Sequence, residues 1–385
     1  MPQGLPHPRR HPRDADQRGG ALGAGQVASA TQAVILAGGQ GTRLRPLTLG
    51  RAKPVVPLLG RPFLAYQLAL LREHGVTDVI LACSYRVDDV RRALGEAEHL
   101  GVRLRYVVET EPLGTGGGVR NAADLARGTV FVLNGDVLTD ADLTAMRGLH
   151  ASRGSRTTIF LMPVADPRAY GLVELDDTGR LTRFREKPTA EEPITTNTIN
   201  AGIYLIDAAL LTRIPAGRPV SIEREFFPAL ITDGIPCFGW TGAAYWRDIG
   251  SPAAYRDAQI DLLAGRVRSS LPPPGQLRGG CWVAPTARLA PGVQLTAPSV
   301  IGERVEIGAG AHVGPMAVIG DDSRIADHAH ITGAILWDHV TVGPHATLRD
   351  CILPSHVTIG PHAHIGPGTV LDPHATIPAH AKIPN

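Results

Sequence analysis

A glycine-rich segment near the start of the sequence is the first feature that could do chemistry. It reads Ala37-Gly38-Gly39-Gln40-Gly41-Thr42-Arg43 and directly follows an apolar run at residues 33–36. Closely spaced glycines allow backbone N–H groups to converge on an anion, and Arg43 supplies a positive charge to neutralise it. The segment lacks both the Gly-Lys-Ser/Thr of a Walker loop and the third glycine of a dinucleotide-binding turn. By itself it indicates either a phosphate site or a structural turn.

Charged residues farther along the chain suit a reaction between two polyanions, namely Lys53, Asp136, Lys187 and Asp248. Asp136 follows the apolar run 130–133, so we expect its carboxylate at the carboxyl end of a strand. A single aspartate there more often caps a turn. In the company of lysines and a second aspartate, it fits a reaction to which the protein contributes positioning and countercharge.

The elements that must position these residues form an alternating pattern. Apolar runs at 33–36, 79–82, 103–108 and 129–133 read as buried strands, and residues 63–74 read as an amphipathic helix. Such alternation predicts an α/β, Rossmann-like domain with a mainly parallel sheet covered on both faces. Ligands of such a sheet bind beyond the carboxyl ends of its strands.

After a proline-rich stretch at 269–275, the hydrophobic period changes to six. The apolar positions, with one-residue slips after Trp337 and Leu348, are Val283, Leu289, Leu295, Ile301, Ile307, Val313, Ile319, Ile325, Ile331, Trp337, Val342, Leu348, Leu353, Ile359, Ile365, Leu371, Ile377 and Ile383. Each is expected to point into a triangular prism, which predicts a parallel β-helix of six coils with three faces each. The pattern resembles the hexapeptide-repeat family, which implies a left-handed coil.

These patterns divide the sequence into four parts. Residues 1–30 contain arginines but no apolar stretch, which predicts a disordered tail, and an over-extended translation start would explain it. Residues 31–265 are expected to form the catalytic domain, 266–280 a linker and 281–385 the β-helix domain.

Composition excludes several classes of partner. The formal net charge of +2 gives no electrostatic case for nucleic acid or a membrane surface. No apolar run approaches the roughly 20 residues needed to span a bilayer. The four cysteines have no CxxC or zinc-type spacing and are interpreted as reduced thiols of a cytoplasmic protein.

With Leu47-Thr48 and Lys53-Pro54 downstream, the glycine-rich segment resembles the signature of the sugar-1-phosphate nucleotidyltransferases. Further matches follow in family order at Glu111-Pro112-Leu113-Gly114-Thr115-Gly116-Gly117, Asn134-Gly135-Asp136, Glu186-Lys187-Pro188, Asn200-Ala201-Gly202 and Trp246-Arg247-Asp248-Ile249-Gly250. The resemblance covers the chain from about residue 31 and is strongest to mannose-1-phosphate guanylyltransferases.

The resemblance implies that a sugar-1-phosphate oxygen attacks the α-phosphorus of a nucleoside triphosphate and pyrophosphate leaves. It assigns the catalytic charges to Arg43, Lys53, Asp136, Lys187 and Asp248, with Mg²⁺ held by Asp136 and Asp248. Nucleotide binding falls to Ala37, Gly38, Gly39, Gly41, Thr42, Arg43, Leu113, Gly114 and Thr115. Sugar-phosphate binding falls to Gly171, Glu186, Lys187 and Asn200. Arg247, Gly116 and Gly117 depart from the family pattern. The two glycines are expected to widen a loop, and we expect all three departures to affect substrate preference.

The expected substrates are GTP and mannose-1-phosphate, giving GDP-mannose. Alternatives are glucose-1-phosphate with dTTP, UTP or ATP, and a non-catalytic regulatory homologue. Ten of the 15 histidines lie in the repeat region, where an acyltransferase could use one of them. Most fall between the inward aliphatic positions, which favours solvated or subunit-contact roles. The β-helix domain is expected to mediate homo-oligomerisation, since its coils present flat side faces.

Overall fold

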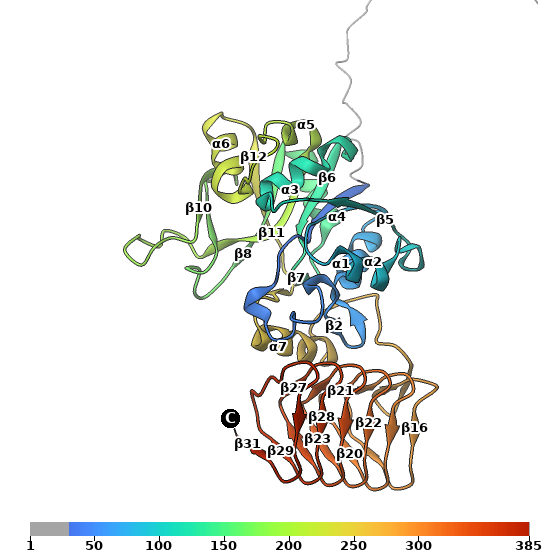
Figure 1. The fold of residues 1–385 in the computed structure, drawn as a ribbon. Coiled ribbons are helices and arrows are strands. Elements are labelled where there is room, and N and C mark those ends of the chain that lie inside the picture. Colours follow the sequence, from blue (N-terminus) through green and yellow to red (C-terminus); the bar gives the residue numbers. More distant parts are fainter. Residues whose placement is uncertain (1–30, 385) are drawn as a thin grey trace, which may run out of the picture.

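The computed structural model describes residues 31–384, so the tail predicted for residues 1–30 lies outside the described residues. An α/β domain stands on a triangular β-helix, with helix α7 between the two (Figure 1). The helices are α1 Phe63–Glu73, α2 Val87–Leu94, α3 Gly114–Ala122, α4 Leu143–Ser152, α5 Ala208–Leu211, α6 Phe227–Thr232 and α7 Pro252–Leu263. Within residues 31–384, no helix is long and apolar enough to cross a membrane.

The central sheet of the α/β domain runs in the order β10-β9-β11-β6-β1-β4-β5, and β8 and β12 extend it beside β11. Strands β1, β4, β5 and β6 are parallel, whereas β11 runs antiparallel to β6. The strands of this domain are β1 Gln32–Leu36, β2 Pro57–Leu58, β3 Arg61–Pro62, β4 Asp78–Cys83, β5 Arg103–Val108, β6 Thr129–Asn134, β7 Val137–Thr139, β8 Thr157–Pro163, β9 Gly171–Leu175, β10 Leu181–Glu186, β11 Thr198–Asp207, β12 Cys237–Thr241 and β13 Trp246–Asp248.

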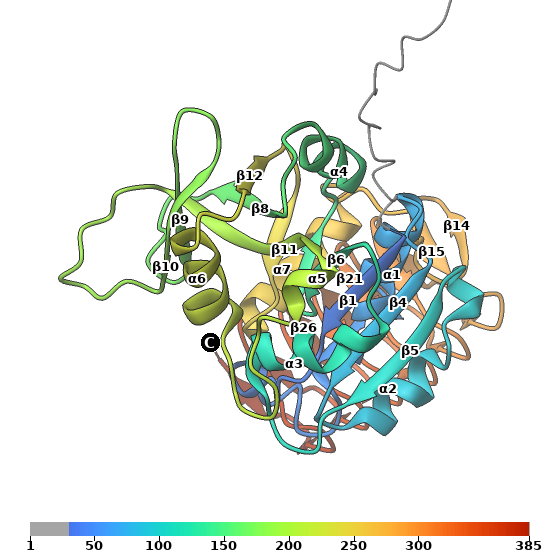
Figure 2. The same cartoon turned by 90° about the horizontal axis from the view of Figure 1, so that it is seen from above.

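Helices cover both faces of this sheet, as the continuous apolar strands predicted (Figure 2). Successive residues of β1 point to opposite faces, so Ile35 joins the core beneath α1 and α4 while Val34 joins the core beneath α3 and α6. All three residues Ala33, Val34 and Ile35 are fully buried. The predicted fold class of this domain is confirmed.

The C-terminal region is a β-helix with three flat faces, in which strands of successive coils pair in parallel and β14 pairs antiparallel with β15. One face contains β14 Gln276–Arg278, β15 Cys281–Val283, β18 Ser299–Ile301, β21 Ala317–Ile319, β24 Ile335–Leu336 and β27 Ile352–Leu353. The second contains β16 Arg288–Leu289, β19 Glu306–Ile307, β22 Arg324–Ile325, β25 Thr341–Val342, β28 Thr358–Ile359 and β30 Thr376–Ile377. The third contains β17 Gln294–Leu295, β20 His312–Val313, β23 His330–Thr332, β26 Thr347–Arg349, β29 His364–Ile365 and β31 Lys382–Ile383. The predicted β-helix is confirmed, although β14 occupies part of the stretch expected to be a linker.

One of the predicted inward positions, Trp337, is wrong. Leu336, not Trp337, fills the prism, because Leu336 stands in register with the buried Ile319 of the preceding coil. The one-residue slip thus falls before Trp337, whose indole is too large for the narrow prism and packs outward against Tyr255 of α7. Leu289 stands in register with the inward Ile307, as predicted, and is 42% exposed because its strand, β16, is an edge strand of the second face.

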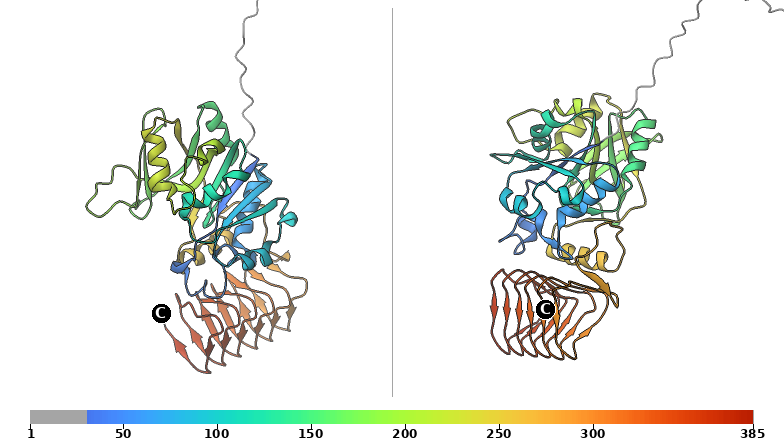
Figure 3. Two further views of the ribbon diagram at one scale, coloured as in Figure 1. Left: turned by 45° about the horizontal axis from the view of Figure 1, so that its top comes forward. Right: turned by 90° about the vertical axis from the view of Figure 1, so that its right-hand side faces the viewer.

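Only the first face of the β-helix is apolar on its outer side. Val300, Val318, Ile335 and Ile352 join Tyr255 in a buried cluster that attaches the β-helix to the α/β domain. Figure 3 shows the α/β domain resting on one side of the β-helix. The other two faces carry exposed polar residues on the outer side of most strands. Burial of this apolar surface fixes which face of the β-helix meets the α/β domain.

Most of the histidines of the repeat region are exposed at the corners of the coils, as expected for solvated side chains. One column contains His328, His345, His362 and His380, with neighbouring ring centroids 5.1, 4.8 and 4.9 Å apart. These residues have positive φ, a conformation in which histidine is more common than most residues.

The corrected frame predicts a difference between two alanine substitutions. Leu336→Ala should lower the free energy of unfolding by about 2–5 kcal/mol because it empties a buried position of the prism. Thr341→Ala, at an exposed position, should change it by less than about 0.5 kcal/mol. Denaturant titration followed by circular dichroism measures both, and equal effects would contradict the register.

Candidate active site

The glycine-rich segment lies at the point where the strand order reverses. Strand β1 is flanked by β4 on one side and β6 on the other, so the chain leaves β1 into the crevice between them. The N–H of Ala37 donates to the carbonyl of Ala82, and the N–H of Gly135 donates to that of Leu36. Gly41 has φ 64°, and a Cβ on it would lie 3.0 Å from Thr48. Backbone hydrogen bonds to the neighbouring strands therefore fix the start of the segment at the sheet edge.

The two candidate metal ligands come together beyond β6. Asp248 stands opposite Val137 in the antiparallel pair of β13 and β7, and the N–H of Ile249 donates to the carbonyl of Asp136 at 2.9 Å. Oδ1 of Asp248 is buried and has no hydrogen-bond partner. Burial, together with the nearby carboxylate of Asp136, raises the pKa of Asp248. An unpaired oxygen beside a second carboxylate is a set that a hard divalent cation would satisfy.

The predicted cations surround this carboxylate pair. Nζ of Lys53 lies 2.8 Å from Oδ2 of Asp136, and Nη2 of Arg43 lies 3.9 Å from Oδ2 of Asp248. The Arg43 side chain is 71% exposed, whereas that of Lys53 is only 11% exposed. Lys53 is thus fixed by its surroundings, while Arg43 remains accessible to a phosphate group.

Two cavities meet at these charges. The first, about 470 Å³, is lined by the glycine-rich segment, Lys53 and Glu109. The second, about 630 Å³, is lined by the expected sugar-phosphate residues Gly171, Glu186, Lys187 and Asn200. Residues common to both linings are Arg43, Gly114, Thr115, Asn134 and Asp136. A triphosphate in the first cavity and a sugar phosphate in the second would therefore meet beside Asp136.

The second cavity has polar groups held in fixed positions. Glu186 stands opposite Gly171 in the pair of β10 and β9, and burial, reinforced by Glu223, raises the pKa of Glu186. Nζ of Lys187 lies 3.7 Å from Oε1 of Glu186. Asn200 accepts from the N–H of Gly202 and donates to the hydroxyl of Tyr204. Neutral and charged hydrogen-bonding groups of this kind suit sugar hydroxyls and a phosphate.

The structure differs from the sequence interpretation at three places. Leu113 lies outside both cavity linings and instead contacts Gly117, where a Cβ would be 2.6 Å from its own Cβ. Gly116 and Gly117 belong to helix α3 and allow it to pack closely on the segment ending at Val220, rather than widening a loop. Arg247 turns away from the cavities and pairs with carboxylates of α7, because its side chain points to the opposite side of β13 from Asp248.

Sequence reasoning did not identify Glu109 and Glu223. Glu109 directly follows β5, is 8% exposed, and accepts from the N–H of Leu113. Burial raises the pKa of Glu109. Glu223 is 9% exposed and accepts from the hydroxyls of Thr115 and Ser221. The position of Glu109 at a strand end, just before the Glu111–Gly117 motif, is the signal that could have identified it.

Comparison with known proteins agrees with this geometry. The chain matches the nucleotidyl transferase family model over residues 32–265 and the LbH domain of the EIF2B epsilon subunit over residues 278–383. It is 42% identical to the mannose-1-phosphate guanylyltransferase of Mycobacterium tuberculosis over 76% of this chain and 80% of that protein. A probable mannose-1-phosphate guanylyltransferase of Oryza sativa is 35% identical over 80% of this chain and 96% of its own length. The crystal structure of HddC from Yersinia pseudotuberculosis superposes with a TM-score of 0.52 and 30% identity, covering 60% of this chain and 99% of that one.

This chain belongs to the nucleotidyl transferase family. The resemblance drawn from the ordered motifs is confirmed, and so is the expectation of an enzyme that joins a sugar-1-phosphate to a nucleoside triphosphate. The match of residues 278–383 to an LbH domain also supports the left-handed coil implied by the hexapeptide repeats.

Gly171 provides a test of the sugar-phosphate cavity. A Cβ at this position would lie 2.6 Å from Oε2 of Glu186 and 3.0 Å from the ring of Phe184. Gly171→Ala should therefore displace Glu186 and raise the KM for the sugar phosphate about tenfold, a change of about 1.4 kcal/mol. Gly148→Ala is the matched control because a Cβ there meets nothing within 4 Å. Steady-state kinetics distinguishes the two, and an unchanged KM in Gly171→Ala would argue against this cavity.

Proposed function

We propose that this enzyme makes GDP-mannose and pyrophosphate from GTP and mannose-1-phosphate. The observation that carries the proposal is the meeting of two cavities at Asp136, Asp248, Lys53 and Arg43. The names of relatives at 42% and 35% identity support the substrate pair. A Yersinia neighbour, HddC, was crystallised with GMP-PN, which supports a guanine nucleotide in the first cavity.

In the proposed reaction, an oxygen of the sugar phosphate attacks the α-phosphorus of the nucleotide. The bond between the α-phosphorus and the oxygen that bridges it to the β-phosphorus breaks, and pyrophosphate leaves. Asp136 and Asp248 would hold Mg²⁺, which would supply positive charge to the phosphate groups. No group of three or more His, Cys, Asp or Glu side chains that could hold a metal ion occurs among residues 31–384, so other oxygen atoms, such as those of the substrate phosphates and water, would complete the coordination. Lys53 and Arg43 would neutralise the triphosphate and the departing pyrophosphate, while Lys187 would orient the attacking phosphate.

Glu109 supports guanine over the other bases. Its carboxylate borders the nucleotide cavity, and one of its oxygens already accepts from Leu113. Guanine presents two adjacent donors, N1–H and the exocyclic amine, to a carboxylate. Uracil and thymine present a single N–H, and adenine presents an acceptor, N1, beside its amine. A buried carboxylate left without such donors would be costly. Glu109 is therefore our candidate for the residue that selects the base.

The proposed assembly and compartment rest on less direct observations. We propose a homo-oligomer that uses a polar face of the β-helix, because the apolar face is already covered by the α/β domain. The four cysteines are free and buried, which is compatible with the reducing cytoplasm. The five predicted catalytic charges border the two cavities, which disfavours a silent regulatory homologue.

A substrate panel tests this assignment directly. GTP, dTTP, UTP and ATP should each be offered with mannose-1-phosphate and glucose-1-phosphate, and pyrophosphate release measured. We expect the highest kcat/KM for GTP with mannose-1-phosphate.

Glu109→Gln should lower kcat/KM for GTP about tenfold and narrow the advantage of GTP over ATP, since one charged acceptor is lost. Glu98→Gln, at an exposed position, is the control. A preference for glucose-1-phosphate would overturn the assignment of the sugar. Unchanged base selectivity in Glu109→Gln would overturn the role of Glu109.

The carboxylate pair is tested by Asp136→Asn. This change removes a charge that would bind Mg²⁺ and should lower kcat at least a hundredfold, as removal of a preorganised electrostatic group commonly does. The Mg²⁺ concentration that gives half-maximal rate should also rise. Asp177→Asn, in an exposed turn, should leave both quantities unchanged. Normal turnover of Asp136→Asn would refute its role.

A further inference from the structure

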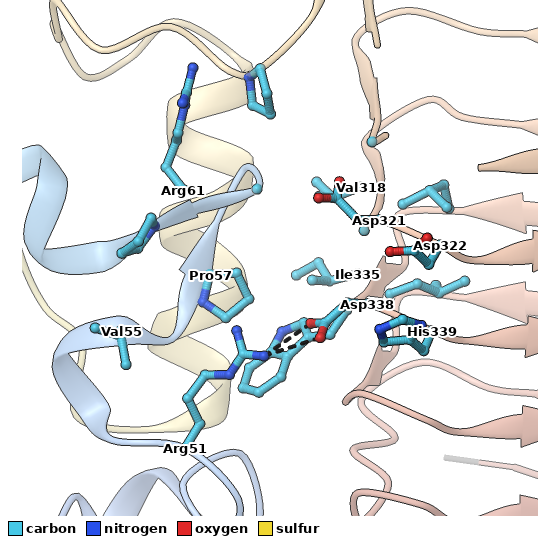
Figure 4. A pocket seen from close by; sticks show the side chains of 18 of the residues that line it. Arg51, Val55, Pro57, Arg61, Val318, Asp321, Asp322, Ile335, Asp338 and His339 are labelled. Carbon is cyan, nitrogen blue, oxygen red and sulfur yellow. Dashed lines mark hydrogen bonds and ion pairs between the residues drawn. The ribbon is translucent and has the colours of Figure 1, made fainter. Parts of the chain in front are cut away.

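The segment that carries Lys53 is attached at one end to the β-helix. Residues 50–57 run between the glycine-rich segment and α1, along a cavity of about 510 Å³ between the α/β domain and the β-helix (Figure 4). Nη2 of Arg51 lies 3.1 and 3.2 Å from the two carboxylate oxygens of Asp338. The Arg51 guanidinium also lies 5.2 Å from the centre of the Trp337 ring, within cation–π range.

The other end of the segment, at Pro57, is linked to the same tryptophan through Tyr255. Nε1 of Trp337 donates to the hydroxyl of Tyr255 at 2.8 Å, and that hydroxyl donates to the carbonyl of Pro57. The side-chain amide of Gln259 donates to this carbonyl at 2.8 Å. Trp337 is only 3% exposed, so its contacts with Arg51 and with Tyr255 lie in the buried junction between the two parts of the protein.

Lys53 lies between these two attachments. It begins a single 3₁₀ turn, Lys53–Val55, whose preceding N–H, that of Ala52, donates to Asp89. From this turn its amine reaches Asp136 at 2.8 Å. One short turn has little rigidity of its own, so contacts on either side of it must fix where the amine stands.

We propose that Arg51, held by Trp337 and Asp338, is a positioning residue that sets the place of Lys53 in the active site. Through Arg51, the β-helix then helps to hold the catalytic lysine in place. This inference rests on the proposed phosphate-neutralising role of Lys53 and adds the residues that determine its position.

The effect should fall on the rate and hardly on the stability. The side chains of Arg51 and Asp338 are 31% and 32% exposed, and ion pairs of such exposure contribute little to folding. In contrast, a displacement of a catalytic group by about 1 Å can cost about a hundredfold in rate. Loss of the Arg51 contacts should therefore lower kcat while the folded protein persists.

Arg256→Ala is the matched control for Arg51→Ala. Arg256 of α7 pairs with Asp350 of the β-helix, so it also crosses between the two parts, with 26% and 44% of these side chains exposed. Within residues 31–384, the Arg256 side chain forms its hydrogen bond and ion pair with Asp350 and none with the 50–57 segment. Arg51→Ala should lower kcat about tenfold with the melting temperature within a few degrees of that of Arg256→Ala. Arg256→Ala should keep kcat within about twofold of the unmodified protein, and Arg51→Lys should recover part of the loss.

A double-mutant cycle separates positioning from a general structural effect. If Arg51 acts through Lys53, Arg51→Ala should have almost no further effect on kcat in a Lys53→Gln background. Additive losses would overturn the inference, as would equal kcat values for Arg51→Ala and Arg256→Ala.

Amide hydrogen exchange gives a readout that does not depend on activity. Exchange in residues 49–57 should accelerate in Arg51→Ala and remain unchanged in Arg256→Ala. If the unmodified protein turned over no sugar phosphate but this difference appeared, the proposed function would fail while the attachment of the segment stood. Unchanged exchange in Arg51→Ala would refute the attachment itself.

Discussion

Negative charge has to be gathered at one point of this protein, and most of the surrounding structure depends on that constraint. Asp136 and Asp248 lie close enough for burial and mutual repulsion to raise the pKa of Asp248. Two phosphate-bearing substrates would add further negative charge at the same place. Lys53 and Arg43 are each within ion-pairing distance of one carboxylate, so positive charge is already present where it is needed. A divalent cation would complete this balance.

The backbone brings these charges together from separate parts of the chain. The parallel strands β1 and β6 end at the same edge, and the small β7–β13 pair returns Asp248 to it after more than a hundred residues. Close packing requires glycine at several of these junctions. A Cβ at Gly135 would lie 2.5 Å from the carbonyl oxygen of Leu36, so only glycine permits β6 to turn away beside β1.

The β-helix has a part in this arrangement because of its apolar outer face. That face buries Val300, Val318 and Ile335 against the α/β domain and presents Trp337 to the segment that carries Lys53. The frame slip before Trp337 therefore places the large indole at the junction, where it packs in the buried cluster with Tyr255, and not in the interior of the prism. Regularity of the repeat was interrupted at the point where the two parts of the protein meet.

The amino-acid sequence was sufficient to predict the fold class, the repeat architecture and a set of site residues of which all but Leu113 line one of the two cavities. The fold class and the repeat follow from local signals, namely the apolar strands and the period of six. The cavity residues follow from the resemblance of the ordered motifs to a known family. Only the folded structure revealed the outward position of Trp337, the absence of Leu113 from both cavity linings and the inclusion of Glu109. Side-chain direction at a frame slip and contacts between distant segments depend on packing volume and on neighbours far away in the sequence, which periodicity does not encode.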